Sequence, residues 1–202
     1  MTFADSFDTA SARMEKFLSW KDHLPSFSSR NIVLDPKNNV CAITQDISGH
    51  KQWNWASNIV TNDGDIFYAI KGAANGTLPA NMSFHTGKCE LRTGAATPAK
   101  ADTYVSVTTP ITASRDTLEA GYSKTADDAA DNSGAAADAV SYKYYWATSD
   151  FAANGIAGGC IHDNATPIAA TKLLTHWSFA DTFSKTSTDT LTLYVNHTMN
   201  GI

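Results

Sequence analysis

The sequence predicts a mainly β protein, an antiparallel β-sandwich or jelly roll with an N-terminal helix and a few short helical turns. Segments that alternate apolar and polar residues recur through the second half of the chain, with polar turns between them. Helical segments do not alternate with strands in the βαβ order of a parallel sheet. We expect residues 1–30 to form a helical arm and residues 31–202 a single sandwich domain with one sizeable core.

Residues 5–20 have the spacing of an amphipathic helix. One face of that helix carries its apolar side chains, Phe7, Ala10, Met14, Phe17 and Leu18. Pro25 is expected to end the helix, because the residue before a proline avoids the helical region. Two interpretations stay open: a helix packed on its own domain, or an arm that docks on another subunit.

The following segment is expected to contain a hairpin, a short helix and a strand. The turn sequence Asp-Pro-Lys-Asn-Asn separates the apolar runs 32–34 and 40–43, which favours a hairpin. A short helix is expected over residues 52–60. A turn at 62–64 is then expected to lead into a strand at 66–70.

From residue 82 onward the sequence predicts strands and loops. Residues 82–94 indicate two short strands or an irregular hairpin about Gly87, and residues 103–109 alternate as a strand does. Residues 114–139 are rich in alanine and aspartate, and we expect a long exposed loop there.

The strongest strand patterns lie after residue 139. Three of them place alternate side chains on one face: Val140, Tyr142, Tyr144 and Trp146; Leu173, Thr175, Trp177 and Phe179; Leu191, Leu193, Val195 and His197. A fourth strand, at 154–163, contains Gly158 and Gly159, which indicate a bulge or a close approach of another backbone. The last strand alternates so regularly that we expect it to be paired on both edges.

Charge and composition argue against several kinds of partner. The formal net charge of −5, without a cluster of Lys and Arg, argues against nucleic acid or an anionic membrane. No run of about 18 apolar residues predicts a transmembrane helix, and the N-terminal residues lack the basic start and apolar core of a signal peptide. We expect a protein folded in a cytoplasm, with Cys41, Cys89 and Cys160 as buried free thiols.

The sequence predicts no catalytic, cofactor-binding or metal site. The six histidines have no partner at metal-binding spacing: His23, His50, His85, His162, His176 and His197. His176 and His197 could meet across strands, although packed histidines are commoner. Residues 61–65, Thr-Asn-Asp-Gly-Asp, lack the rest of a calcium loop and indicate a turn. The acidic side chains of the long loop could hold a cation or simply be solvated: Asp127, Asp128, Asp131 and Asp138.

The aromatic residues leave a binding function open. Trp53 and Trp55 alternate with polar residues, so one of them is expected at the surface. Exposed aromatic rings bind sugars in lectin-like sandwiches, although core and interface aromatics are commoner. The alternative function is therefore a carbohydrate- or receptor-binding β-sandwich module. A polysaccharide or peptidoglycan hydrolase comes last, because it needs two carboxylates in a cleft.

Four segments in order resemble a family of small virion-associated proteins of tailed bacteriophages. They are IVTNDGDIFYA at 59–69, DTLEAGYSK at 116–124, YYWATSDFAANGIAGGCIHDN at 144–164 and FADTFSKTSTDTLTLYVNHTM at 179–199. The likeness covers residues 40–201 and depends on order and spacing, because no single motif is specific. The chain departs from the family at Ala157, where glutamate is common, and at Tyr122.

The resemblance implies a non-enzymatic structural component of a tailed-phage virion. Such a subunit would serve in capsid decoration, as a head–tail connector in the neck, or as a tail protein, and would be assembled in the host cytoplasm. Its expected partners are the major capsid, neck or tail proteins and further copies of the chain in a homo-oligomer. No cofactor, nucleic acid or membrane is expected.

Overall fold

The structure is a computed structural model. It describes residues 39–73, 77–79, 82–84, 87–125, 139–164 and 166–198, so the predicted arm at 1–30 lies outside the described residues. The strands are β1 (Val40–Gln45), β2 (Lys51–Val60), β3 (Lys88–Arg92), β4 (Asp116–Thr117), β5 (Lys124–Thr125), β6 (Ala139–Trp146), β7 (Ala153–His162), β8 (Leu173–Lys185) and β9 (Thr190–Thr198). The helical elements are the α-helix α2 (Asn62–Gly72) and the 3-10 turns η2 (Tyr104–Ser106) and η3 (Thr112–Ser114).

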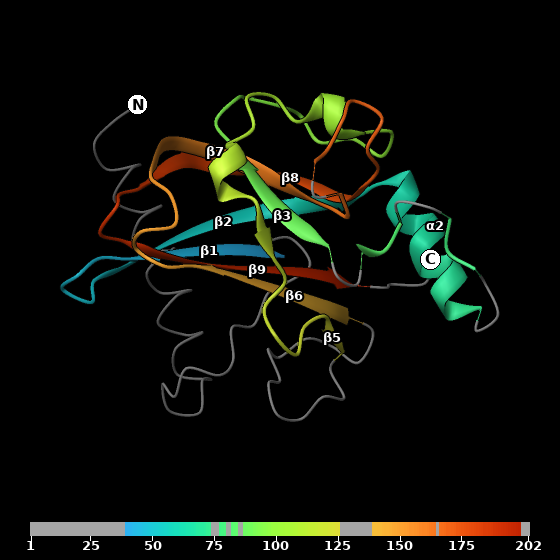
Figure 1. Ribbon diagram of the computed structural model, residues 1–202, viewed down its shortest axis with the longest axis horizontal. Coiled ribbons are helices and arrows are strands. Elements are labelled where there is room, and N and C mark those ends of the chain that lie inside the picture. The colour runs from blue at the N-terminus through green and yellow to red at the C-terminus, as the bar shows by residue number, and fades with distance from the viewer. Residues whose placement is uncertain are drawn as a thin grey trace, which may run out of the picture.

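The nine strands of the described residues form one antiparallel sheet in the order β4-β3-β7-β8-β2-β1-β9-β6-β5 (Figure 1). The sheet coils until its ends meet, because the Glu119 N–H donates to the Lys143 carbonyl and the Trp146 indole N–H donates to the Ser114 carbonyl. The fold is therefore a nearly closed barrel, with α2 against β8 and β2 at one end (Figure 1). The mainly β, antiparallel prediction is confirmed, but the strands share one sheet in place of the two expected for a sandwich or jelly roll.

The chain crosses four times between the two halves of this sheet, β4-β3-β7-β8 and β2-β1-β9-β6-β5: from β2 to β3, from β4 to β5, from β6 to β7 and from β8 to β9. Residues 147–152 connect β6 to β7, and residues 186–189 connect β8 to β9, although neither pair is adjacent in the sheet. The β1–β2 hairpin lies between β8 and β9 instead. The inner faces of both halves therefore contribute to one core.

The apolar faces predicted for the three late strands line this core except at Leu173, which packs with Val107 and Cys160 in a separate cluster while its neighbour Leu174 enters the core. Its largest fully buried side chains include Tyr142, Tyr144, Trp146 and Trp177. The Tyr144 and Trp146 rings stack with centroids 6.3 Å apart, and Trp146 meets Phe151 edge-on at 5.9 Å. Strand β9 pairs with β1 on one edge and with β6 on the other, which confirms the expectation of a central last strand.

Strand β2 replaces the short helix predicted for residues 52–60, and that prediction was wrong. One edge of β2 pairs with β1 and the other with β8, and this long-range pairing overrides the local pattern. Strand β1 itself pairs with both β2 and β9. No edge of β1 is left for the predicted hairpin with residues 32–34, which lie outside the described residues.

Helix α2 replaces the turn predicted at 62–64 and the strand predicted at 66–70. The Thr61 side chain caps the helix by accepting a hydrogen bond from the Gly64 N–H at 3.2 Å. Two aspartates lie in the first turn, where their negative charges are attracted by the positive end of the helix dipole. Lys71 lies in the last turn, at the negative end. The stretch that indicated a turn is therefore a helix start.

Two further segments differ from the prediction. Only β3 is a strand within the described part of residues 82–94, and residues 103–109 contain the turn η2. The Tyr104 N–H donates to the Thr171 carbonyl, so this segment is bound beside β8 by its backbone and does not run as a strand of its own. In the predicted exposed loop, Ser114 is fully buried and β4 and β5 extend the sheet, while residues 126–138 lie outside the described residues.

The predictions for the glycines of β7 and for the cysteines are confirmed. The pairing of β7 with β8 shifts register between Ile156 and Gly158. A Cβ on Gly158 would come closer than 3.0 Å to the Trp177 carbonyl and to the Arg92 guanidinium. All three cysteines are buried and free, and burial raises the pKa of each thiol well above its ordinary value. Among the described residues, no helix is sufficiently long and apolar to span a membrane.

Gly64 should be intolerant of a side chain, whereas Gly72 in the same helix should accept one. A Cβ on Gly64 would come closer than 3.0 Å to the Leu174 carbonyl and to the Val60 side chain, whereas a Cβ on Gly72 meets nothing within 4 Å. We expect Gly64→Ala to lower the free energy of unfolding by about 1–3 kcal/mol. Gly72→Ala should leave it unchanged or raise it by up to about 1 kcal/mol.

Urea unfolding of the two variants and the parent chain measures this difference. Equal effects of the two substitutions would contradict the close packing of α2 against β8.

Candidate functional site

A group of buried ionisable side chains lies on the outer face of β3, β7 and β8, beneath the loop of residues 94–107. Cys89 and Leu91 of β3 face the core, so the residues that alternate with them face outward. The fully buried members of the group are Glu90, Arg92, His162 and His176.

Glu90 binds three side chains at once. Its Oε1 accepts from Arg115 Nη2 at 2.8 Å, and its Oε2 accepts from the Tyr104 hydroxyl at 2.8 Å and lies 3.3 Å from His162 Nε2. Burial alone would raise the pKa of Glu90, but the hydrogen bonds with His162, Arg115 and Tyr104 bring it below its ordinary value. Glu90 is therefore a charged carboxylate with both oxygens bound.

Arg92 and Asp102 meet through the ring of His176. Arg92 Nε donates to His176 Nε2 at 3.1 Å, and His176 Nδ1 lies 2.7 Å from Asp102 Oδ2. Because a guanidinium can only donate, Nε2 is the acceptor and the ring proton lies on Nδ1. Burial lowers the pKa of His176, which agrees with a neutral ring. The remaining guanidinium nitrogens donate to Gly94, Trp177 and Ser178.

The cluster around Glu90 and the cluster of Arg92, His176 and Asp102 both attach the loop 94–107 to the sheet. Asp102 and Tyr104 come from the loop, whereas Glu90 and Arg92 come from β3. Charge-assisted hydrogen bonds of this kind are stronger than neutral ones. The arrangement therefore holds a loop in place, with its carboxylates and imidazoles already bound to other side chains.

The outer face of the other half of the sheet carries two rows of side chains that run across four strands. The register of β2, β1, β9 and β6 places Trp53, Ile43, Thr192 and Tyr145 in the first row. It places Trp55, Cys41, Tyr194 and Lys143 in the second. We call these eight residues the aromatic rows.

The aromatic rows combine packed and accessible rings. Trp53 and Trp55 stack with centroids 6.2 Å apart, and both are half-buried, whereas the sequence predicted one of them at the surface. The Lys143 ammonium lies 5.8 Å from the centroid of the Tyr194 ring. Tyr145 is 40% exposed and ends the first row at β6.

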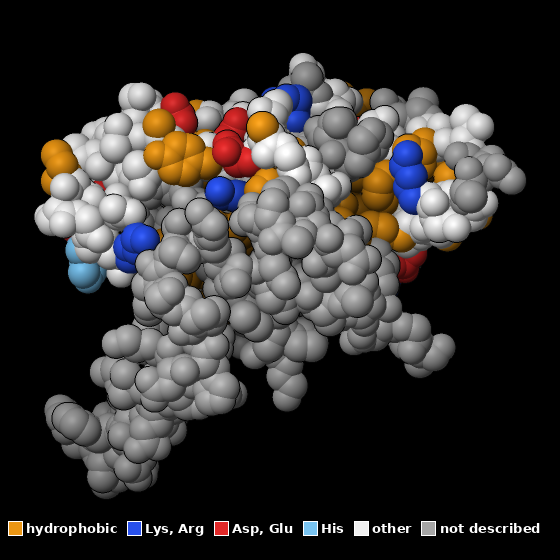
Figure 2. Space-filling view, turned by 90° about the horizontal axis from the view of Figure 1, so that it is seen from below, with side chains coloured by type: hydrophobic (Ala, Val, Ile, Leu, Met, Phe, Trp, Pro, Cys, Tyr) orange, Lys and Arg blue, Asp and Glu red, His pale blue; other side chains and the backbone are white. Residues whose placement is uncertain are grey.

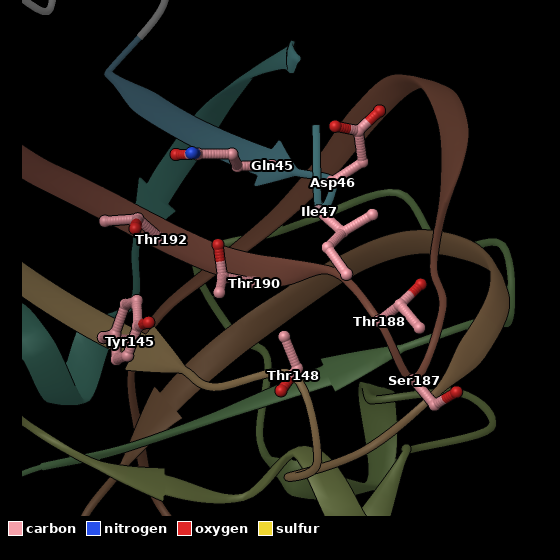
Figure 3. Close-up of a pocket in the computed structure, with 9 residues that line it drawn as sticks. All are labelled: Gln45, Asp46, Ile47, Tyr145, Thr148, Ser187, Thr188, Thr190 and Thr192. Atoms are coloured by element: carbon pink, nitrogen blue, oxygen red, sulfur yellow. The ribbon is translucent and has the colours of Figure 1, made fainter. Parts of the chain in front are cut away.

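A hollow of about 440 Å³ opens at the Tyr145 end of the rows (Figure 3). Five hydroxyl residues line it: Thr148, Ser187, Thr188, Thr190 and Thr192. Gln45 and Asp46 add an amide and a carboxylate, and Ile47 and Tyr145 add apolar surface.

The two turns that border the hollow are held by their own side chains. Asp46 Oδ1 accepts from the Ser48 and His50 N–H groups, each at 2.9 Å. Asp189 Oδ2 accepts from the Thr186 N–H at 2.8 Å. The border of the hollow is therefore shaped before any ligand binds.

The structure separates the histidines that the sequence analysis considered as a pair. His176 on β8 binds Asp102, whereas His197 on β9 lies 2.5 Å, through Nδ1, from the Tyr68 hydroxyl of α2. No three or more His, Cys, Asp or Glu side chains in the described ranges are grouped to hold a metal ion. His23, His85 and the four loop aspartates lie outside those ranges.

Sequence reasoning missed both the buried clusters and the hollow. Glu90 and Arg92 alternate with apolar residues in Lys-Cys-Glu-Leu-Arg, and this was the available signal for buried charges on a covered face. The hollow had no signal of its own, because its residues come from strands that only the fold brings together. Comparison of the chain with protein-family models, curated proteins and solved structures finds no match.

Removing the buried guanidinium should cost far more stability than removing an exposed ammonium. Arg92→Met leaves His176 Nε2 and the Trp177 carbonyl without their donor, so we expect a loss of about 3–5 kcal/mol. Lys100→Met removes a surface ion pair with Asp65 whose side chains are 55% and 54% exposed, and should cost at most about 1 kcal/mol.

Chemical unfolding of the two variants under one set of conditions makes the comparison. Similar small losses would show that the loop does not depend on Arg92.

Stability should fall below pH 6.5 because of His197. Burial lowers its pKa from 6.5 to about 3, so the unfolded chain takes up a proton that the folded chain does not. The groups that face the ring are the Tyr68 and Tyr142 hydroxyls, whose pKa burial raises. His197 therefore causes no loss of folding stability above pH 6.5, and the loss grows as the pH falls toward 3. At about pH 4.5 the loss should be about 3 kcal/mol.

His197→Gln keeps an acceptor for Tyr68 and does not titrate, so its unfolding free energy should change less than that of the parent between about pH 7 and about pH 4.5. His50→Gln, at a side chain that is 79% exposed, is the matched control and should follow the parent. An equal pH dependence in all three proteins would contradict the assignment.

Proposed function

We propose that the chain is a non-enzymatic structural component of a tailed-phage virion, in capsid decoration, neck or tail, and that it acts through protein–protein assembly. The observation that carries the proposal is the pair of aromatic rows on the outer face of β2, β1, β9 and β6. The four ordered segments that resemble phage virion proteins supply the setting, and the rows supply a means of association.

The composition of the rows suits the centre of an interface. Four of the eight residues are aromatic, and Lys143 alone is charged. Interface cores are enriched in Trp and Tyr and depleted in charge, and a few such residues carry most of the binding energy. Strand β1 is paired on both edges beneath the rows, so the surface is rigid before association.

The charge distribution favours protein over nucleic acid as the partner. Figure 2 shows hydrophobic side chains of the described residues interspersed with Lys, Arg, Asp and Glu on the side that it views. The described residues in this view therefore present no extended positive surface for a phosphate backbone. The partner that we propose for the rows is a second copy of this chain in a closed symmetric oligomer, which in turn contacts capsid, neck or tail proteins.

Light scattering of the purified full chain with size separation tests assembly, and we expect a trimer or larger. Trp53→Thr removes one aromatic ring from the rows and should weaken association at least about tenfold. Val105→Thr, at a 71% exposed position in η2, is the control and should leave the mass unchanged.

The virion setting needs a separate experiment. Mass spectrometry of purified particles from a phage that encodes the chain should find it in many copies. Its absence from such particles would overturn the proposal, whatever the oligomeric state of the isolated protein.

A further inference from the structure

We propose that the hollow beside Tyr145 is a binding site for a neutral carbohydrate. This inference goes beyond assembly, and its site shares Tyr145 and Thr192 with the aromatic rows. The site combines an accessible aromatic ring, a set of free hydroxyl and amide groups, and a border that its own turns hold in shape.

Apolar surface in the hollow is confined to two accessible side chains. Tyr145 is 40% exposed and Ile47 is 88% exposed. Thr190 lies between them in the view of Figure 3. A sugar ring presents an apolar C–H face together with polar edges, and an aromatic side chain with a polar tip complements both. Two apolar side chains separated by a hydroxyl therefore match a ring of alternating character better than a purely apolar ligand.

Five polar side chains of the hollow are free to bind. Within the described residues, no hydrogen bond engages the Gln45 amide, the Tyr145 hydroxyl or the hydroxyls of Thr148, Thr190 and Thr192. Each hydroxyl can donate once and accept twice, and the amide both donates and accepts. Sugar hydroxyls need both kinds of partner, and neighbouring groups of this type meet that need.

The framework that positions these groups is rigid. Tyr145 stands opposite Thr192 in the β6–β9 ladder, and Gln45 stands opposite Thr190 in the β1–β9 ladder. The bordering turns are held by Asp46 and by Asp189. Ligand binding therefore requires little ordering of the protein, which lowers its entropic cost.

The charges of the residues that line the hollow indicate which class of carbohydrate it can bind. Among the described residues that line the hollow, Asp46 is the only Asp, Glu, Lys, Arg or His, and its Oδ1 is occupied by two backbone N–H groups. Neither Lys nor Arg is available to neutralise a sulfate, phosphate or sialic acid carboxylate. The volume of about 440 Å³ is within the ~300–1,000 Å³ range of small-molecule sites. We expect a neutral mono- to trisaccharide unit, bound with a dissociation constant on the order of 1 mM.

NMR titration of the full chain tests the site. The probes are neutral di- and trisaccharides of glucose, galactose, mannose and N-acetylglucosamine, with sialyllactose as the charged comparison. At least one neutral saccharide should shift amides within 45–48 and 187–192 more strongly than sialyllactose does. No binding by any of the neutral probes at up to about 20 mM, or shifts confined to other parts of the chain, would overturn the proposal.

Three variants separate recognition from folding and from assembly. Tyr145→Ala should weaken saccharide binding about tenfold, whereas Tyr145→Phe keeps the ring and should stay within about threefold of the parent. Gln45→Ala lies outside the aromatic rows, so it should weaken saccharide binding without changing the mass from light scattering. Unchanged saccharide affinity in both alanine variants would exclude the hollow as the site.

Discussion

The pairing of β1 along both edges, with β2 and with β9, is the constraint on which the rest of the structure depends. It inserts a hairpin between two strands that are consecutive in the chain and so joins the two halves of the sheet. It also decides which side chains face outward. Val40 and Ala42 enter the core, whereas Cys41 and Ile43 lie in the aromatic rows, and a slip of one residue would exchange the two sets.

The outer faces of the two halves of the sheet carry different kinds of side chain and contact. Over β3, β7 and β8, the loop 94–107 covers the sheet and is held by the bound charges of Glu90 and Arg92. Over β2, β1, β9 and β6, aromatic side chains and free hydroxyls stand on a paired backbone. This difference is the physical basis of our two proposals, that association and ligand binding use the second surface.

The sequence predicted what short-range periodicity determines. The faces of β6 and β9, most of the face of β8 and the close approach at Gly158 follow from alternation and from the need for space, and the structure confirms them. The exception is Leu173, which packs outside the core with Val107 and Cys160. The order of strand and helix at 52–70 was inverted, because β2 is a strand through its pairing with β1 and β8. Thr61, with two aspartates after it, was a local capping signal that outweighed the turn character of the same stretch.

The hollow lay beyond prediction from the sequence for a different reason. Its lining comes from residues 45–47, 145–148 and 187–192, and only the insertion of β1 beside β9 brings these segments together. Threonines in two separate segments carry no spacing signal that could indicate a common site. The buried clusters differ in this respect, because charged residues that alternate with apolar ones in β3 indicated a covered outer face.

Amide-resolved hydrogen–deuterium exchange of the full chain tests the central role of β1 most directly. Both edges of β1 are hydrogen-bonded, so the amides of Val40–Gln45 should be among the slowest to exchange and should open only with global unfolding. The two-residue edge strands β4 and β5 should exchange much faster. Exchange of the β1 amides at the rate of β4 and β5 would contradict the pairing on which the core, the aromatic rows and the hollow depend.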